Sequence, residues 1–230
     1  MNPSSRTILD LTQTLAPDIP IWPGDPSVAI EPVATISDSG YLLHRLQLGE
    51  ASGTHFACSA HFATDGVTME AFPAEQLIVP GVCIDVRQAV LQNPDFELTV
   101  DWIQQWEKAN GTIPERSAVL LCTGWSRHWH SPERYLAPPT PGYGLAAAQM
   151  LAQQRGVVGL GIDTHGIDRG SDTTFSVNSY WLHGERFHLE NLTNLESLPA
   201  AGFMLFVGAL NIAGGAGSPA RVLAMVGSNW

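Results

Sequence analysis

The sequence is poor in positive charge. Its 230 residues include 11 Lys and Arg against 22 Asp and Glu, a formal net charge of −11, and its single lysine is Lys108. A nucleic-acid binder needs clustered Lys and Arg to contact phosphates, so this composition argues against a nucleic-acid partner. The acidic balance slightly favours a neutral or cationic ligand over a polyanion.

Long apolar runs and paired cysteines are also missing. No window approaches 18 uninterrupted apolar residues, and no apolar stretch behind residues 1–6 is long enough for a secretory signal. The three cysteines, Cys58, Cys83 and Cys122, form no CxxC pair and leave one thiol over, which fits a reducing compartment. We therefore expect a soluble, cytoplasmic protein with no membrane partner.

What is present predicts one mixed α/β domain over residues 1–230. A hydrophobic content of 44% is enough to bury a substantial core. Thr99 is placed to cap a helix that runs to residue 109 and stops at Gly111, and a second helix is expected over residues 144–154. Strand-like runs outnumber these helices, which disfavours a simple doubly wound sheet. The strand-like runs cover residues 7–11, 29–36, 42–48, 81–85, 118–123, 157–162 and 203–210.

The most informative stretch is residues 52–62, Ser-Gly-Thr-His-Phe-Ala-Cys-Ser-Ala-His-Phe. It resembles the signature His-x-Gly-Thr-His-x-Asp-x-Pro-x-His-Phe of the kynurenine formamidase-like cyclase family. Several signature residues are kept, namely Gly53, Thr54, His55, His61 and Phe62. The first His, the Asp and the Pro are replaced by Ala51, Ala57 and Ser59.

Further segments resemble the family's motifs in the family's order. They are the loop at 18–26 with Trp22, the strand end at 121–126, the turn at 161–168 with His165 where Pro is usual, the Glu-Asn-Leu segment at 189–195, and the closing Gly-Ser-Pro-x-Arg at 217–221. The resemblance implies the family fold, a swivelling β/β/α barrel, and assembly as a homodimer or homotetramer.

The resemblance also implies a metal site whose ligands are depleted here. In metal-dependent members the two earlier His and the Asp of the signature join a later His and the Glu of the Glu-Asn-Leu segment around one or two metal ions. His55 and Glu190 match this set, whereas Asn178 stands where the later His is expected. A catalytic zinc normally needs three protein ligands, so the sequence favours a site without a metal or other cofactor. A metal would persist if His61, Cys58 or another His were recruited, although Cys58 is more simply read as a buried structural thiol.

A site of this kind favours acid-base chemistry on a small molecule. The resulting hypothesis is a metal-independent cyclase that closes a ring in a secondary-metabolite intermediate, with His61 as general base or acid, His55 as its proton-transfer partner and Glu190 as the orienting carboxylate. The residues expected to bind the substrate are Trp22, Phe62, His165 and Asn178. Two alternatives stay open: a metal-dependent hydrolase of an amide or lactone with a rebuilt metal site, and a non-catalytic small-molecule-binding homologue.

Overall fold

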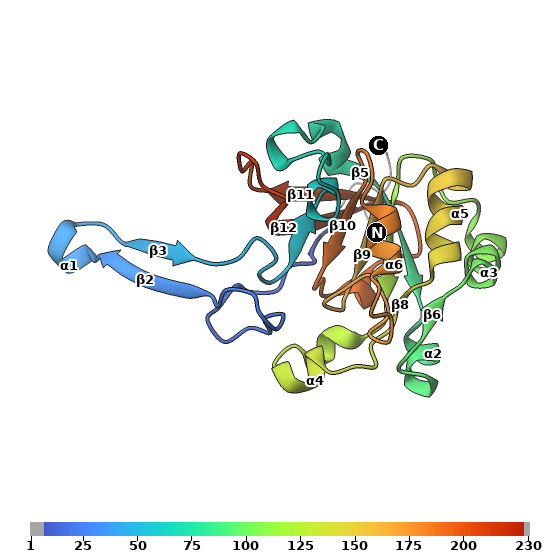
Figure 1. Ribbon diagram of the computed structural model, residues 1–230, viewed down its shortest axis with the longest axis horizontal. Helices are drawn as coiled ribbons and strands as arrows, with labels where there is room; N and C mark the ends of the chain where they lie inside the picture. Colours follow the sequence, from blue (N-terminus) through green and yellow to red (C-terminus); the bar gives the residue numbers. More distant parts are fainter. Residues whose placement is uncertain (1–6, 228–230) are drawn as a thin grey trace.

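Seven strands close into a barrel in the computed structural model of the chain, which describes residues 7–227. Their order is β12 (Gly217–Val226), β11 (Phe203–Ala209), β5 (Ile78–Asp85), β7 (Ala118–Cys122), β9 (Gly159–Ile162), β10 (Phe187–Glu190) and β4 (His55–Ala57). Strand β4 pairs back with β12 and closes the barrel, and β1 (Thr7–Asp10) adds to β12 from outside (Figure 1).

The barrel is parallel on one side and antiparallel on the other. Strands β5, β7, β9 and β10 run parallel to one another, whereas β4, β12 and β11 pair antiparallel. Side chains alternate between the two faces of each strand, so every second residue points into the barrel. The interior is apolar and is filled from six of the seven strands by residues that include Phe56, Cys83, Leu120, Phe187, Leu189, Leu205 and Val222.

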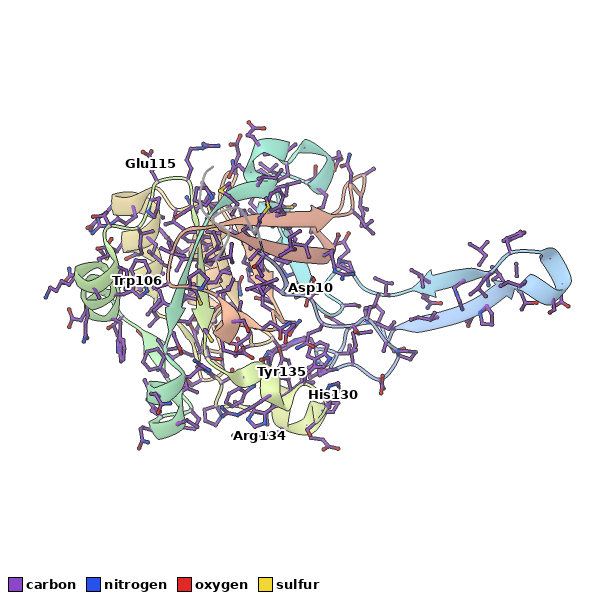
Figure 2. All side chains as sticks on the ribbon, turned by 180° about the vertical axis from the view of Figure 1, so that it is seen from behind. Asp10, Trp106, Glu115, His130, Arg134 and Tyr135 are labelled. Atoms are coloured by element: carbon purple, nitrogen blue, oxygen red, sulfur yellow. The ribbon has the colours of Figure 1, made fainter. Side chains whose placement is uncertain are left out.

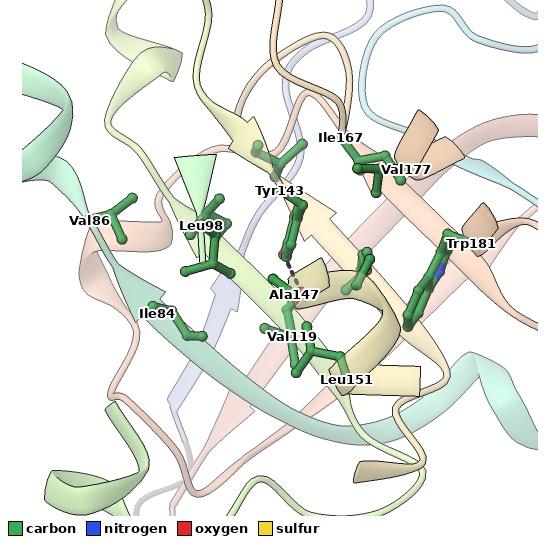
Figure 3. Close-up of a cluster of buried hydrophobic side chains, with 14 of the residues drawn as sticks. Ile84, Val86, Leu98, Val119, Tyr143, Ala147, Leu151, Ile167, Val177 and Trp181 are labelled. Carbon is green, nitrogen blue, oxygen red and sulfur yellow. Dashed lines mark hydrogen bonds between the residues drawn. The ribbon is translucent and has the colours of Figure 1, made fainter. Parts of the chain in front are cut away.

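Helices cover part of the outer face of the barrel. A second core lies between the strands and helices α3 (Val100–Asn110), α5 (Leu145–Arg155) and α6 (Ser176–Trp181). Figure 3 shows Val119, Tyr143, Ala147 and Leu151 meeting there, with the Tyr143 hydroxyl 2.8 Å from the Val119 carbonyl oxygen. The Thr99 hydroxyl accepts a hydrogen bond from the Trp102 amide and caps α3, as expected from the sequence.

Short elements complete the body of the molecule. They are α2 (Arg87–Gln92), α4 (Pro132–Leu136), the paired strands β6 (Glu97–Leu98) and β8 (Gly142–Tyr143), and the 3₁₀ turns η1 (Ser59–His61), η2 (Met69–Ala71), η3 (Ala74–Leu77), η4 (Trp125–His128) and η5 (Leu195–Ser197). Among residues 7–227, no helix is both long and apolar enough to cross a bilayer.

A two-stranded arm projects from the barrel. It consists of β2 (Ala29–Ala34) and β3 (Leu43–Gln47), which pair only with each other among the described strands, and of the single-turn helix α1 (Ile36–Ser39) at its tip. Both views of the molecule show the arm standing away from the body (Figures 1 and 2), and Figure 2 shows its side chains projecting away from the rest of the chain.

The single-domain mixed α/β fold expected from the sequence is confirmed. Each of the seven strand-like runs contains an observed strand, and the two expected helices correspond to α3 and α5. Five strands were not predicted from the sequence: the short β6 and β8, and β4, β10 and β12, which carry or flank the candidate site. The prediction concerning residues 1–6 falls outside the described part of the chain.

Candidate functional site

The candidate site is built on the outer face of two neighbouring strands, β4 and β10. The register of this antiparallel pair sets Glu190 opposite His55 and His188 opposite Ala57. Residues two apart in a strand share a face, and directly opposite residues of an antiparallel pair have Cβ atoms ~4.5–5.5 Å apart. Two imidazoles and a carboxylate therefore converge on one face, while the residues between them fill the barrel.

The three polar side chains are buried and in close contact. His55, His188 and Glu190 are 4%, 1% and 6% exposed. One Glu190 carboxylate oxygen lies 3.3 Å from His55 Nε2, and the other lies 3.6 Å from His188 Nε2. The Ile167 amide donates a hydrogen bond of 3.0 Å to the second oxygen and fixes the carboxylate.

The loop before β4 sets the orientation of His55. Gly53 has a φ of 66°, a conformation that favours glycine, and its carbonyl oxygen lies 3.0 Å from His55 Nδ1 and 2.8 Å from the Asn191 side-chain nitrogen. A carbonyl oxygen only accepts, so Nδ1 carries the hydrogen of His55. Its Nε2 faces Glu190 and donates to that carboxylate when the ring is protonated, whereas in the neutral ring this nitrogen offers a lone pair.

The charges of the three groups are strongly coupled. Burial raises the pKa of Glu190, but the neighbouring imidazoles of His188 and His55 outweigh burial and lower it to about 2. Burial opposes protonation of His55, yet its hydrogen bond to Glu190 and the charge of that carboxylate raise the pKa of His55 overall. Burial lowers the pKa of His188 to about 4, so this ring is neutral near pH 7.

Within residues 7–227, His188 has no hydrogen-bond partner for either ring nitrogen, although it is almost fully buried. Buried polar atoms without a partner are rare and costly. Its ligand atom, that of His55 and that of Glu190 all lie within 4.8 Å of one another. Two ligands of one zinc ion, each ~2.0–2.2 Å from the metal, lie up to about 4 Å apart, so small side-chain shifts would let one ion take all three. Two His and one Glu form a known catalytic zinc set, and these residues therefore fit the metal that the family implies.

His61 approaches the same group from the turn η1. Its ring centroid lies 6.2 Å from that of His188 and 5.1 Å from that of Phe62. Burial lowers the pKa of His61 although Glu190 acts in the opposite sense, so the ring is neutral near pH 7 and can accept a proton. The sequence prediction that His55, His61 and Glu190 gather in one place matches the geometry.

An aromatic rim borders the site. We use this term for Trp22, Phe62 and Phe175, which are 44%, 40% and 40% exposed. The Phe175 ring lies 6.4 Å from Trp22 and 6.1 Å from Phe62, measured between centroids. The His165 ring lies 5.0 Å from that of Trp22, measured between centroids, and both of its nitrogens are buried with no hydrogen-bond partner among the described residues. A ligand held by this rim would lie close to His165 and to His61 of the polar cluster.

Asn178 is engaged elsewhere. Its side-chain nitrogen donates to Asp168 at 2.9 Å, and the same carboxylate accepts from the backbone amides of Val177 and Asn178. This arrangement fixes the start of α6 against the turn at 166–168. The Asn178 side-chain oxygen is buried and has no partner in the described part of the chain.

The sequence analysis missed His188. The Glu-Asn-Leu segment begins at Leu189, one residue after His188, so the motifs by themselves point only to His55 and Glu190 as ligands. A detectable signal existed, because His188 and Glu190 have the i, i+2 spacing that places two side chains on one face of a strand. The inference that too few ligands remain for a metal rested on this omission.

Other motif residues have structural roles. Thr123 donates to buried Asp163 through its amide at 3.0 Å and its hydroxyl at 2.6 Å, and the Trp125 amide donates to the same carboxylate at 3.0 Å, which ties the end of β7 to the end of β9. The Cys58 thiol is buried 3.2 Å from the Ala216 carbonyl oxygen, and burial raises its pKa. A protonated, enclosed thiol is a poor nucleophile.

Comparisons with known proteins point to one family. Residues 9–169 match the cyclase family, described as "Putative cyclase". The chain is 32% identical to an isatin hydrolase of Roseibium aggregatum, over 95% of this chain and 91% of the relative, and 26% identical to a kynurenine formamidase of Erythrobacter litoralis, over 92% and 90%. Its structure superposes on isatin hydrolase A from Labrenzia aggregata with a TM-score of 0.91 at 33% identity, covering 97% of this chain and 94% of that one.

These relatives correct the functional hypothesis. A non-hydrolytic cyclase was the favoured interpretation of the sequence, but the relative that matches nearly the whole chain at 32% identity is a hydrolase, and so is the similar solved structure. The alternative of a hydrolase with a rebuilt metal site is supported better, since a third ligand is present. The chain belongs to the cyclase family, the family that its kynurenine formamidase-like motifs indicated.

Proposed function

We propose that this protein is a metal-dependent hydrolase that opens the amide bond of a small aromatic cyclic amide such as isatin. One observation carries the proposal: two imidazoles and a carboxylate converge within 4.8 Å on a buried face, and one imidazole makes no hydrogen bond to any described residue. The similarity to isatin hydrolases over almost the whole chain supplies the substrate class.

His55, His188 and Glu190 would hold the metal. A metal ion in such a site acidifies bound water and stabilises the negative charge that develops on a carbonyl oxygen. The protein supplies the surroundings. Asn191 and His55 share the Gly53 carbonyl oxygen, and the Ile167 amide holds Glu190, so both ligand side chains are oriented before any metal or substrate binds.

His61 is the proposed proton carrier. Hydrolysis adds a hydroxyl group to the carbonyl carbon, breaks the bond from carbon to nitrogen and places a proton on the released nitrogen. A neutral imidazole beside the cluster can take the proton from water and deliver it to that nitrogen, a contribution of about 10²–10⁴-fold. This keeps the acid-base role predicted from the sequence but applies it to ring opening.

The aromatic rim supports a flat, apolar substrate. Trp22, Phe62 and Phe175 offer ring faces and edges, and offset or edge-to-face aromatic contacts contribute about 0.5–1.5 kcal/mol beyond area burial. His165 offers a donor or an acceptor to a carbonyl or amide of such a ring, which agrees with its predicted role in substrate binding.

The test is the turnover of isatin by the purified protein with Mn²⁺ or Zn²⁺ added, or with a chelator, followed by mass spectrometry for the gain of one water. We expect ring opening that needs the metal, that is lost in Glu190→Gln and that is retained in His130→Ala, a matched change at an exposed histidine. N-formylkynurenine serves as the open-chain amide for comparison. Failure to add water to either compound with any added metal would overturn the proposal.

A further inference from the structure

His165 presents a second imidazole that the described residues leave without a hydrogen bond. Both of its ring nitrogens are buried, as those of His188 are. Burial lowers the pKa of His165, although Glu190 acts in the opposite sense, so the ring is neutral near pH 7 and offers one N–H donor and one lone pair. A buried donor without a partner is costly, and a ligand can remove that cost by supplying the acceptor.

The turn that carries His165 holds its shape without the imidazole. The Thr164 hydroxyl donates to the Gly166 carbonyl oxygen at 2.7 Å, and the Ile167 amide donates to Glu190. The motif that this turn resembles has Pro at the position of His165, a residue with no polar side-chain atom. The shape of the turn therefore gives no reason for an imidazole here, which leaves a role in binding.

Backbone contacts place His165 next to both the His and Glu cluster and the aromatic rim. On either side of it, the Thr164 carbonyl oxygen and the Ile167 amide form hydrogen bonds of 2.8 and 3.0 Å with residues 191 and 190. The His165 ring lies 5.0 Å from that of Trp22, measured between centroids, with the two planes inclined by 46°. A flat ligand that rests on the rim and reaches the cluster therefore passes this imidazole.

Two polar groups near this turn already have partners. The Tyr135 ring lies 6.0 Å from that of His165, and its hydroxyl lies 2.8 Å from Asn191 Oδ1 and 3.1 Å from the Asp163 carbonyl oxygen. The Asn191 side-chain nitrogen is engaged as well, because it donates to the Gly53 carbonyl oxygen at 2.8 Å. His165 is therefore better placed than either of them to pair with a polar atom of a ligand.

We infer that His165 selects cyclic amides that carry a second carbonyl beside the amide carbonyl, by donating a hydrogen bond to the second carbonyl oxygen. When the amide carbonyl is at the His and Glu cluster, the adjacent ring atom of the substrate points toward the turn that carries His165. A keto oxygen there accepts the N–H, whereas a methylene leaves the buried donor unpaired, and a site rejects an analogue in this way. A carbonyl carbon also keeps the ligand flat against the rings of the rim, whereas a carbon that bears a hydroxyl is tetrahedral. The choice of a cyclic amide rests on the proposed hydrolase function; the selection of a second carbonyl is tested by binding alone.

The selection is tested by equilibrium dialysis of the full-length protein in the presence of a chelator, which suppresses metal-dependent turnover. The two compounds are isatin and oxindole, which is the same ring system with a methylene in place of the second carbonyl. We expect wild type to bind isatin about 10-fold more tightly than oxindole, and His165→Leu to bind the two within about 2-fold of each other, because isatin alone loses a hydrogen bond. His165→Gln keeps an N–H donor and should retain most of the preference. His130→Leu, the same change at an exposed histidine, should retain all of it.

Two results would overturn the inference: equal affinity of wild type for isatin and oxindole, or an unchanged preference in a folded His165→Leu variant. Circular dichroism checks the fold, and His165→Phe, which also lacks a donor, decides in the same way if the leucine variant is unfolded. The hydrolase proposal is judged separately. A protein that prefers isatin through His165 but never opens the ring would contradict that proposal and support this inference. A protein that opens isatin and keeps the preference in His165→Leu would do the reverse.

Discussion

Individual residues explain how the proposed metal site would do without the ligands usual in the family. Ala57 stands where the family signature has Asp, and the register of β4 and β10 sets His188 directly across from it. Side chains opposite each other in an antiparallel pair reach the same space. A ligand removed from one strand can therefore be replaced from its neighbour, and a motif read along one strand does not reveal the exchange.

This exchange can be reversed by mutation. His188→Ala should lower the affinity for Mn²⁺ or Zn²⁺ by at least 10-fold, because only two ligands remain. Adding Ala57→Asp to that variant should restore most of the affinity, because the new carboxylate enters the same space from β4. Isothermal titration with each metal measures the effect. A double variant that binds no better than His188→Ala would show that the two positions do not serve the same site.

Proton transfer and metal binding should separate at His61. His61→Ala should lower kcat by about 10²–10⁴-fold while the metal content is unchanged, because the ring lies beside the cluster without belonging to it. Cys58→Ser is the control, and it should keep both metal and turnover, since the thiol is enclosed beside the Ala216 carbonyl. A dead Cys58→Ser beside an active His61→Ala would reverse the assignment of roles.

At the scale of elements, the sequence predicted the strands that are continuously apolar. It did not predict β4, β10 and β12, which carry or flank the candidate site. Runs such as 118–122 are continuously apolar, which is typical of a strand buried on both faces. Strand β4 has only three residues, β10 carries His188 and Glu190 on one face, and β12 begins Gly-Ser-Pro. Each departs from the usual composition because it serves the site or the closure of the barrel, and its pairing is decided by distant parts of the chain.

Helix α6, which adjoins the aromatic rim, depends on Asp172. This carboxylate accepts hydrogen bonds from the Ser176 and Thr174 hydroxyls and from the amides of the same two residues, and these bonds lower its pKa. The ionised Asp172 therefore contributes fully to the free energy of unfolding at neutral pH. This contribution is lost as the pH falls below 3.8, the ordinary pKa of Asp, toward the lowered pKa of the folded protein. Asp172→Asn should lower the free energy of unfolding by about 1 kcal/mol at pH 7, with a smaller difference at pH 3.

Urea unfolding at the two pH values measures this difference. The exposed neighbour Thr173 provides the matched control, because Thr173→Ala removes a hydroxyl from the same turn without touching the carboxylate. A difference between wild type and Asp172→Asn that grows on acidification would contradict the assignment of the stabilising charge to Asp172.

At the scale of the whole molecule, motif order predicted the architecture better than the chemistry. The five segments spread over residues 18–221 indicated the family, and the barrel with its helical layer agrees. The reaction class could not be obtained in the same way, because it depends on which side chains meet across strands. The motifs alone offer two metal ligands, and this led to the prediction of a metal-independent cyclase. The folded chain adds His188 as a third possible ligand, which favours a hydrolase.

The most direct measurement is an anomalous diffraction map from crystals of the full-length protein grown with one equivalent of Zn²⁺ or Mn²⁺. A single ion should appear between β4 and β10, bonded to His55, His188 and Glu190 at ~2.0–2.2 Å, and it should be absent from crystals of His188→Ala. No anomalous peak at these three residues in wild type, or an ion that binds them equally well without His188, would contradict the rebuilt metal site and the hydrolase built on it.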